Sequence, residues 1–246
     1  MAEKTAAPRT RRERVEQKER AILDAARTTF IERGYDGAAI VEIARRAGIS
    51  EGSIYSYYKT KHELMQAVLA EFWDQLTAGA ERAVDVGLPT FEQMRALAAY
   101  HLDAVIENFD FVNLTFALRR SGSEVAASRE QMRRYVAVFD NIARRGMDRG
   151  DIRPDSVIWL MRDSFYGTLE YAARTLIGRS RRAGEDFAAV VANLVHEIAA
   201  GHGTGSGEIA PPASSSGQNL DQILERLEAV AGRLEAASDS GTSKRR

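Results

Sequence analysis

The sequence of 246 residues predicts an all-helical protein. Apolar residues recur at three- and four-residue steps along most of the chain, whereas the alternation of a half-buried strand is nearly absent. The five prolines fall in expected turns, linkers or the N-terminal arm, and an apolar fraction of 44% is enough for a buried core. We therefore expect about nine helices and a short extra C-terminal helix, divided between an N-terminal three-helix domain and a larger helical domain.

The first three helices are predicted from the residues that flank them. The first runs from about Arg14 and ends at Gly34, because glycine is favoured directly after a helix. The second covers about 40–47 and ends at the glycine that follows. The third begins after Ser50, a favoured N-cap residue, and ends near Tyr57.

Six further helices are predicted between breaks in the apolar pattern. The breaks are a Gly-Leu-Pro turn before Thr90, a polar Ser-Gly-Ser run at 121–123 and a Gly- and Pro-containing loop at 150–154. Thr90 is expected to cap the helix that follows, with Gln93 completing a capping box. The predicted ranges are 61–84, 90–107, 124–149, 155–177 and 184–200, and one further helix between the second and third of these holds Phe109, Val112, Leu114 and Phe116.

Charge is unevenly distributed along the chain. Residues 1–65 carry 13 Lys and Arg against 10 Asp and Glu, although the whole chain has a net charge of −1. Much of the excess lies in residues 1–13, an expected flexible arm, which precedes the predicted domains at 14–60 and 61–200. A weakly basic head on an acidic body fits contact with phosphates at one end. A solvated tail without a partner would have the same composition.

The C-terminal part has a different composition. Residues 201–218 are rich in Gly, Ser and Pro, cannot bury a core, and are expected to be a flexible linker. Residues 219–237 keep a 3-4 apolar spacing and predict an amphipathic helix, while 238–246 are expected to be disordered. This helix either docks on its own chain or reinforces a dimer as a short coiled coil. We expect a chain that lacks residues 201–246 still to dimerise and bind DNA.

Several classes of protein are disfavoured by what the sequence lacks. Without cysteine there is no disulfide, thiolate metal site or Cys nucleophile. The four histidines are scattered without metal-ligand spacing, and neither a phosphate-binding Gly-rich loop nor a Gly-x-Ser-x-Gly motif occurs. No apolar run approaches the ~20 residues of a membrane helix, and the N-terminus lacks a secretory core. We expect a cytoplasmic protein that is not an enzyme and has no cofactor, metal or membrane partner.

Residues 43–58, IARRAGISEGSIYSYY, have the layout of a helix-turn-helix, whose second helix enters the DNA major groove. Side chains that reach the groove floor are small or polar, and this helix offers such residues. Ile54 is expected to pack against the preceding helix, and Tyr58 to lie in the core. Lys61 opens the next helix, where an ammonium and free backbone N–H groups suit a phosphate. The predicted DNA contacts are Arg12, Arg14, Ile40, Ser50, Glu51, Gly52, Ser53, Tyr55, Ser56, Tyr57 and Lys61.

Residues 22–64 resemble the N-terminal domain of the tetracycline-repressor (TetR) family of bacterial regulators. The family usually has a Thr before its second helix, which caps that helix and touches a phosphate, whereas this chain has Ala39. Tyr58 replaces the commoner Phe, which adds a hydroxyl that needs a partner. The matching residues are Ala25-Ala26, Phe30, Gly34-Tyr35, Ile43-Ala44, Ala47-Gly48-Ile49-Ser50, Gly52-Ser53-Ile54-Tyr55, Tyr57-Tyr58, Lys61 and Leu64.

This resemblance implies a ligand-responsive DNA-binding regulator, most simply a repressor. It implies a homodimer through the eighth and ninth helices, a ligand pocket enclosed by the fourth to seventh, and a fourth helix that moves on ligand binding. Geometry alone also favours a dimer, because one reading head covers only a few base pairs. Two heads about one helical turn apart (~34–36 Å) require a near-palindromic operator.

Residues 149–171 resemble the C-terminal domain of the fatty-acid-degradation repressors of that family, which implies a fatty acyl-CoA effector. The alternatives are another hydrophobic or aromatic ligand, as in efflux-type regulators, and an activator in place of a repressor. Gly167 is expected to allow two helices to approach closely. Arginines at 119, 120, 133, 134 and 174 suit an anionic headgroup. The predicted ligand-binding residues are Phe109, Leu114, Phe116, Arg120, Arg134, Phe139, Phe165, Tyr166 and Leu169.

Overall fold

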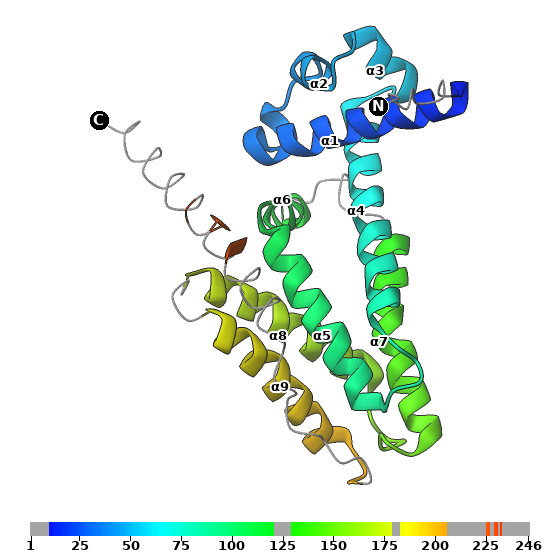
Figure 1. The fold of residues 1–246 in the computed structure, drawn as a ribbon, viewed down its shortest axis with the longest axis vertical. Helices are drawn as coiled ribbons and strands as arrows, with labels where there is room; N and C mark the ends of the chain where they lie inside the picture. Colours follow the sequence, from blue (N-terminus) through cyan, green and yellow to red (C-terminus); the bar gives the residue numbers. More distant parts are fainter. Residues whose placement is uncertain are drawn as a thin grey trace, which may run out of the picture. The chain divides into compact units, whose positions relative to one another are not determined.

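The computed structural model describes residues 10–120, 129–178 and 183–205, together with five residues between 225 and 232. In these residues the only β pairing is an isolated antiparallel bridge between Ile152 and Gly203. The all-helical prediction is therefore confirmed (Figure 1). The helices are α1 (Arg11–Gly37), α2 (Ile40–Ala47), α3 (Glu51–Tyr57), α4 (Lys61–Ala83), α5 (Thr90–Glu107), α6 (Phe109–Arg120), α7 (Arg129–Arg149), α8 (Ile158–Gly178) and α9 (Ala183–His202).

Helix α1 begins earlier than the sequence analysis expected. The Thr10 hydroxyl accepts from the Glu13 backbone N–H at 3.2 Å, and the Glu13 carboxylate accepts from the Thr10 N–H at 2.7 Å. This reciprocal capping box fixes the start at Arg11, so Arg12, like Arg14, lies on the helix rather than in the expected flexible arm. Gly34 interrupts the helix as expected, with φ 71° and ψ 171°.

The predicted capping box of α5 was wrong. Pro89 occupies the N-cap position and supplies no side-chain hydrogen bond. The Thr90 hydroxyl instead donates to the Asp151 carboxylate at 2.7 Å, and the Gln93 amide donates to the Leu88 carbonyl at 2.6 Å. Both side chains therefore hold loops that flank the helix.

The expected linker also begins later than residue 201. Helix α9 continues to His202, whose carbonyl accepts from the Arg153 N–H at 2.8 Å. The Thr204 N–H then donates to the Asp151 carbonyl at 3.1 Å. These bonds tie residues 202–204 to the loop between α7 and α8.

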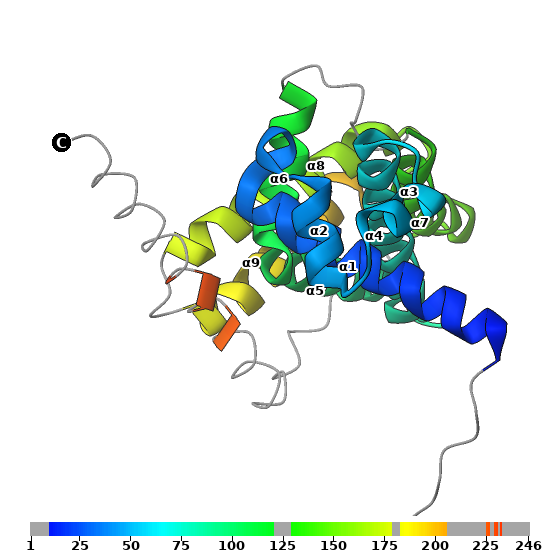
Figure 2. The same ribbon diagram turned by 90° about the horizontal axis from the view of Figure 1, so that it is seen from above.

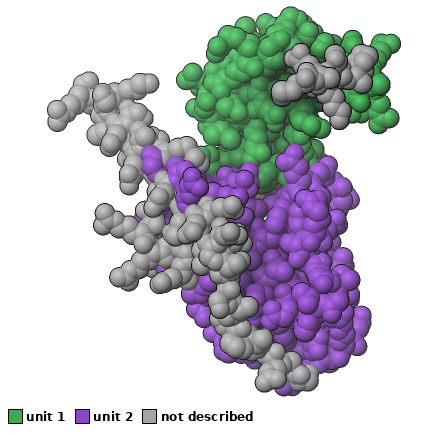
Figure 3. Space-filling model, viewed as in Figure 1, with its two compact units in different colours: residues 1–72, 110–129 green, residues 73–109, 130–246 purple. Residues whose placement is uncertain are grey.

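The chain divides into two compact units, coloured separately in Figure 3. Unit 1 comprises residues 1–72 and 110–129, and unit 2 comprises 73–109 and 130–246. The boundary differs from the expected one near residue 60, because the first part of α4 and nearly all of α6 group with the N-terminal helices. In unit 1, α1 packs on α2 and α2 on α3. The core there has no exposed surface at Ile22, Ala26, Phe30, Ile43 and Ile54.

Unit 2 is built around α5, α8 and α9. Helix α5 packs on both α8 and α9, and these two pack on each other, as both ribbon views show (Figures 1 and 2). One apolar face of α5, including Met94, Leu97 and Leu102, has no exposed surface. Such burial of several large side chains, each contributing about 1.5–3 kcal/mol, stabilises the unit.

The described residues of the segment 219–237 are helical and contact α5. The Arg226 guanidinium donates to the Asp103 carboxylate at 2.6 Å. Val230, one turn further along, is only 2% exposed. These two contacts agree with the alternative in which the segment docks on its own chain.

Gly79 of α4 lies directly against the Tyr100 side chain of α5. A Cβ built on Gly79 would overlap the Tyr100 ring and hydroxyl, and that hydroxyl donates to the Leu76 carbonyl at 3.1 Å. We expect Gly79→Ala to lower the free energy of unfolding by about 1–3 kcal/mol, because the overlap outweighs the better helix propensity of alanine. Urea denaturation measures the change. Gly201→Ala is the control, since its Cβ would meet nothing within 4 Å, and equal stability of the two variants would contradict the close approach.

Candidate nucleic-acid interface and effector site

Helix α3 presents the side chains that the sequence predicts for reading DNA. The Ser50 hydroxyl caps it by accepting from the Ser53 N–H at 3.2 Å, and Ile54 anchors it in the core with no exposed surface. The Ser56 hydroxyl donates to the Ser53 carbonyl at 2.6 Å, so it is partly engaged within the helix. Exposed residues are Glu51, Gly52, Tyr55 and Ser56, and Ser53 and Tyr57 are half-buried.

Tyr58 is half-buried at the end of α3, and its hydroxyl has a partner. It donates to the Glu19 carboxylate of α1 at 3.2 Å. Burial, followed by the Glu19 charge, raises the pKa of the Tyr58 phenol well above its usual value. The hydrogen bond thus joins α1 to the end of α3. It compensates for part of the stabilisation that a phenylalanine ring at this position would gain from packing.

Both ends of α2 have the features that the sequence indicates. Gly48 follows it in the left-handed conformation (φ 68°) and its N–H bonds back to the last turn. Ala39 stands at the N-cap and offers no side-chain hydrogen bond. The cap that a threonine would supply is therefore missing, and Ile40, half-buried, begins the helix.

Two neighbouring arginines of α2 have different surroundings. Arg46 pairs with Glu32 of α1 and, at 3.3 Å, with Glu42 of its own helix. The hydrogen bond from Arg46 lowers the pKa of Glu32. Arg45 is exposed and has no ion pair within the described residues. The sequence analysis did not single out Arg45, although a basic pair beside the turn was the available signal.

Lys61 does not have the role that the sequence predicts for its side chain. Its ammonium donates to three carbonyls after Gly34, those of Tyr35 at 2.9 Å, Asp36 at 3.2 Å and Ala38 at 3.2 Å. It also lies 4.8 Å from the centre of the Tyr35 ring. All three N–H donors are used, so the phosphate contact predicted for the Lys61 side chain was wrong. The side chain instead caps the end of α1.

We expect Lys61→Met to destabilise the protein by about 1.5–3 kcal/mol, because carbonyls bonded to a cation lose their partner. Chemical denaturation measures this. Lys59→Met is the matched control, since Lys59 is exposed and makes one bond of 3.3 Å to the Tyr55 carbonyl. If Lys61→Met keeps full stability and only reduces the salt dependence of DNA binding, the capping role is wrong.

The predicted N-terminal contacts, Arg12 and Arg14, are exposed on the first turns of α1. Arg12 pairs with Glu16 at 2.8 Å, with 88% of the Arg12 side chain exposed. Such an exposed pair contributes little to stability and does not prevent contact with a phosphate.

Part of the predicted effector site forms one cluster in unit 2. The rings of Phe139 and Phe165 lie 4.9 Å apart, and Phe165 meets Tyr166 edge-on at 5.1 Å. Leu169 follows on the same face of α8 with no exposed surface. Phe109 is also buried in unit 2, beneath the Arg174 guanidinium at 5.6 Å.

Other predicted ligand contacts do not join this cluster. Leu114 and Phe116 are half-buried residues of α6 and belong to unit 1. Arg134 is paired with Asp74 at 2.6 Å, with about half of each side chain exposed. The side chain of Arg120 lies outside the described residues.

Two polar members of the cluster, His101 and Tyr135, were not among the predicted ligand-binding residues. His101 of α5 is 4% exposed and bonds through Nδ1 to the Tyr135 hydroxyl at 2.6 Å. Tyr135 also stacks near Trp73, with ring centres 5.7 Å apart. The available signal was a histidine at an apolar position of α5, four residues after the buried Leu97.

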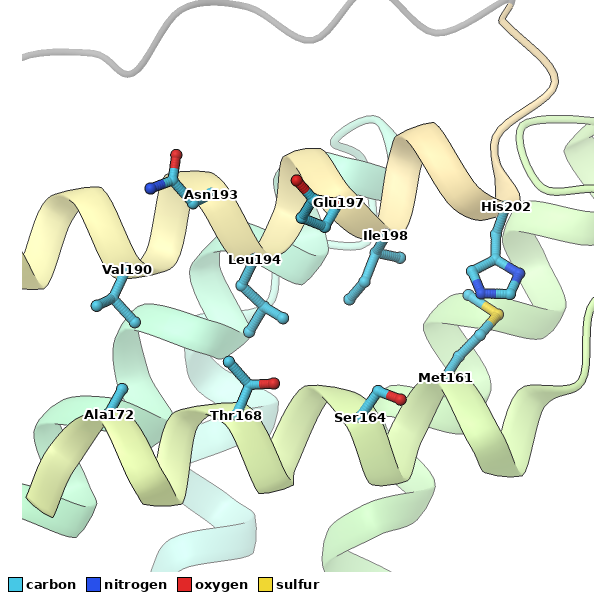
Figure 4. Close-up of a pocket in the computed structure, with 10 residues that line it drawn as sticks. All are labelled: Met161, Ser164, Thr168, Ala172, Val190, Asn193, Leu194, Glu197, Ile198 and His202. Carbon is cyan, nitrogen blue, oxygen red and sulfur yellow. The ribbon is translucent and has the colours of Figure 1, made fainter. Parts of the chain in front are cut away.

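A groove of about 500 Å³ follows the contact between α8 and α9. In Figure 4 Ser164, Thr168 and Ala172 of α8 face Val190 and Leu194 of α9 across it. Small side chains therefore line the α8 wall, and the α9 wall combines the apolar Val190, Leu194 and Ile198 with the polar Asn193 and Glu197. His202 and Met161 close one end.

Large apolar side chains are exposed on α8 itself. Trp159 is 58% exposed, Leu160 47% and Tyr171 78%. A Cβ on Gly167 would meet nothing within 4 Å. Contrary to the expectation for Gly167, no helix within the described part of this chain approaches it closely. Helix α8 therefore has large apolar side chains that no described residue covers.

The described residues lack both a membrane-spanning helix and a cluster of metal-ligating side chains. No helix there is long and apolar enough to cross a bilayer. No group of three or more His, Cys, Asp or Glu side chains there is arranged to hold a metal ion.

The chain is similar to known bacterial regulators. The fatty acid metabolism regulator protein of Bacillus subtilis (strain 168) is 25% identical over 158 residues, covering 63% of this chain and 81% of that protein. The solved structure of FadR from Bacillus subtilis in complex with stearoyl-CoA has a TM-score of 0.63 and 22% identity, covering 73% of this chain and 96% of that chain. The ketosteroid regulator KstR2 of Mycobacterium tuberculosis has a TM-score of 0.54 and 21% identity, covering 76% and 95%.

The N-terminal helices give the most specific match. Residues 22–68 match the family model described as bacterial regulatory proteins, tetR family. This range contains the helix-turn-helix, its Ser50 cap and its buried Ile54. Residues 22–68 therefore form a DNA-binding domain of the tetR family of bacterial regulatory proteins, and the helical fold is similar to that of the solved regulators.

Proposed function

We propose that the protein is a homodimeric repressor that leaves a near-palindromic operator when a hydrophobic effector binds. The observation that carries this proposal is helix α3, with a buried anchor at Ile54 and an outer face at Gly52, Tyr55 and Ser56 that no described residue covers. A short helix held in this way is suited to the major groove. Our best candidate for the effector is a fatty acyl-CoA.

The phosphate contacts of this head come from its exposed polar and basic groups. Arg45 is unpaired within the described residues, Arg12 and Arg14 are exposed, and the Tyr55 side chain is 42% exposed. Backbone N–H groups at the start of α4 provide a further site, because the positive end of a helix favours an anion.

We expect Arg45→Ala to weaken binding to all duplexes alike and to lower the slope of log affinity against log salt by about one, because one phosphate contact is lost. Fluorescence anisotropy at several salt concentrations measures the slope. Arg133→Ala removes an equally exposed arginine from α7 of unit 2 and should leave the slope unchanged. An unchanged slope for Arg45→Ala would remove this residue from the interface.

Dimerisation is proposed through α8 and α9. A second copy of these helices would bury the groove between them together with the exposed Leu160 and Tyr171 of α8. Gly167 has free space on this helix, which permits close approach of a partner helix.

The effector is proposed to bind in unit 2 and to act on the head through α4 and α6. Unit 1 contains residues of both helices. Phe72 of α4 and Phe111 of α6 meet edge-on at 5.1 Å, and the Arg27 guanidinium of α1 lies 4.8 Å from the Phe111 ring. Movement of either helix therefore acts directly on α1, which carries the reading head.

The proposed identity of the effector rests on the similarity of this chain to regulators of known structure. The similar structure of FadR contains stearoyl-CoA, and the ring cluster of unit 2 supplies an apolar environment. Another hydrophobic ligand is the alternative, favoured by the similarity to a ketosteroid regulator.

A shift assay with the DNA upstream of the protein's own gene tests the proposal. We expect a sequence-specific complex that weakens steeply with salt and dissociates on addition of stearoyl-CoA, but not of free CoA. Absence of a specific, salt-sensitive complex would contradict the DNA-binding function. A complex that persists with stearoyl-CoA would contradict the acyl-CoA effector. Repression and activation are distinguished by transcription from the bound promoter in vitro.

A further inference from the structure

Three polar side chains from three helices meet in the buried ring cluster of unit 2. His101 lies on α5, Tyr135 on α7 and Tyr166 on α8, and they are 4%, 2% and 8% exposed. The His101 ring centre is 5.8 Å from that of Tyr135 and 4.8 Å from that of Tyr166, and the two tyrosines are 5.4 Å apart. A packed core does not need three polar groups at one point.

All three groups are uncharged at neutral pH. Burial lowers the pKa of His101 to about 3 and raises the pKa of both phenols well above their usual value. The Tyr135 hydroxyl and His101 Nδ1 are hydrogen-bonded across 2.6 Å, and Tyr135 is the donor in the tautomer that carries the imidazole proton on Nε2.

Two of the polar atoms are not fully satisfied within the protein. His101 Nε2 makes no hydrogen bond to any described residue, and the Tyr166 hydroxyl has only the hydroxyl of Tyr135 near it. Leaving a buried polar group unpaired is costly, so natural cores rarely retain one without a reason. Two donors within one ring cluster suit a single acceptor with two lone pairs, and a carbonyl oxygen is such an acceptor.

We propose that His101 and Tyr166, with Tyr135 orienting the imidazole, recognise the carbonyl oxygen of the hydrophobic effector. This inference rests on the proposed function, because it places the effector within unit 2. Phe139 and Phe165 supply apolar walls, with ring centres 6.3 Å and 5.1 Å from that of Tyr166. An acyl thioester and a ketosteroid both carry a carbonyl in hydrocarbon surroundings.

A carboxylate fits this point poorly. Burial is the only influence on the pKa of His101, so no charge acts on the imidazole. The charges that act on Tyr166 are Asp140 and Arg162, which are paired with each other at 3.1 Å. A carboxylate here would lose its hydration without gaining a free cation. The recognition point therefore selects an uncharged oxygen.

The test compares ligands that differ only in this oxygen. Stearoyl-CoA is paired with its thioether, S-octadecyl-CoA, and a 3-ketosteroid with the corresponding steroid hydrocarbon. Calorimetry on the full-length protein measures each affinity. We expect the wild type to bind the carbonyl member of at least one pair roughly tenfold tighter or more, because the other member leaves both donors unpaired. The pair that shows the preference identifies the source of the carbonyl.

Variants test whether the polar atoms cause the preference for the ligand with the carbonyl oxygen. His101→Phe should bind both members of the pair equally, at about the affinity of the wild type for the member without the carbonyl. Phe165→Leu is the control, because it removes an apolar wall and should weaken both members alike, which leaves their ratio unchanged. Circular dichroism checks the fold of each variant. Tyr166→Phe removes a single hydroxyl and should lower the ratio of the two affinities in part. If His101→Phe does not fold, the comparison between Tyr166→Phe and the wild type provides the test.

The outcomes separate this inference from the proposed function. Equal affinity of the wild type for both members, or an unchanged preference in His101→Phe and Tyr166→Phe, would overturn the recognition point, while operator release by stearoyl-CoA would still support the acyl-CoA effector. If the wild type binds neither pair, the recognition point is also overturned. The operator complex formed without ligand then tests the DNA-binding function independently.

Discussion

Thr168→Arg is expected to separate the dimer and to lower operator affinity by about a hundredfold or more. Thr168 is exposed in this chain and lines the groove between α8 and α9 (Figure 4). An arginine is much larger than the threonine that it replaces and overpacks a helix interface lined on α8 by small side chains, which costs about 1–3 kcal/mol for each copy in the dimer. A monomer carries a single reading head and loses the effective concentration that links the two half-sites.

Analytical ultracentrifugation and operator titration measure the two effects of Thr168→Arg. Asn141→Arg is the matched control, because Asn141 is an exposed polar residue on α7, outside the proposed interface. A Thr168→Arg protein that remains a dimer at micromolar concentration would exclude this groove from the interface. A monomer that binds the operator as tightly as the wild type would contradict the need for two heads.

Tyr55→Ala is expected to lower operator affinity roughly tenfold to a hundredfold. The reason is that a hydrogen bond to a charged group, which contributes about 1.5–3 kcal/mol, would be lost. The Tyr55 side chain is 42% exposed on α3, whereas Tyr57 lies partly against Tyr58, with ring centres 6.4 Å apart. Substitution of Tyr55 therefore removes a contact with DNA at little cost to the fold. Tyr55→Phe should show most of the same loss, because the proposed contact with a phosphate is made by the hydroxyl.

The control for Tyr55 is Ile31→Ala, which shortens a partly exposed apolar side chain on α1. Its operator affinity should equal that of the wild type, and both variants should keep the wild-type melting temperature. Undiminished operator affinity of Tyr55→Ala would place this side chain away from the duplex, and a large loss of stability would show that it supports the fold instead.

Features set by neighbouring residues were predicted well from the sequence. Gly34 and Gly48 both adopt positive φ where a helix was expected to end, and the Ser50 hydroxyl caps α3 as expected. The reason is that caps depend on residues within one helical turn. Ile54 was placed in the core correctly, because helical spacing decides which side of a short helix is buried.

Features set by distant partners were not predicted. Thr90 carries a favoured N-cap side chain, but Asp151, 61 residues away, accepts its hydrogen. Lys61 has the composition of a phosphate contact, yet its ammonium is used by carbonyls 23 to 26 residues earlier in the chain. Local patterns do not show which of several acceptors the tertiary fold brings closest.

The candidate effector site was predicted only in its apolar part. Phe139, Phe165 and Tyr166 were selected as aromatic residues of the larger domain and form one cluster. His101 was set aside because histidines without a metal-binding pattern carry little information in a sequence. Its significance depends on complete burial and on the bond to Tyr135, 34 residues later, which only packing produces.

The most direct test of the central claim is selection of bound duplexes from a pool of random sequence by the full-length protein. The account predicts enrichment of one near-palindrome, with half-sites about one helical turn apart, bound by an even number of chains. Tyr55→Ala should fail to enrich it under the same conditions. Recovery of duplexes without any common sequence, or of a single half-site bound by one chain, would contradict the account.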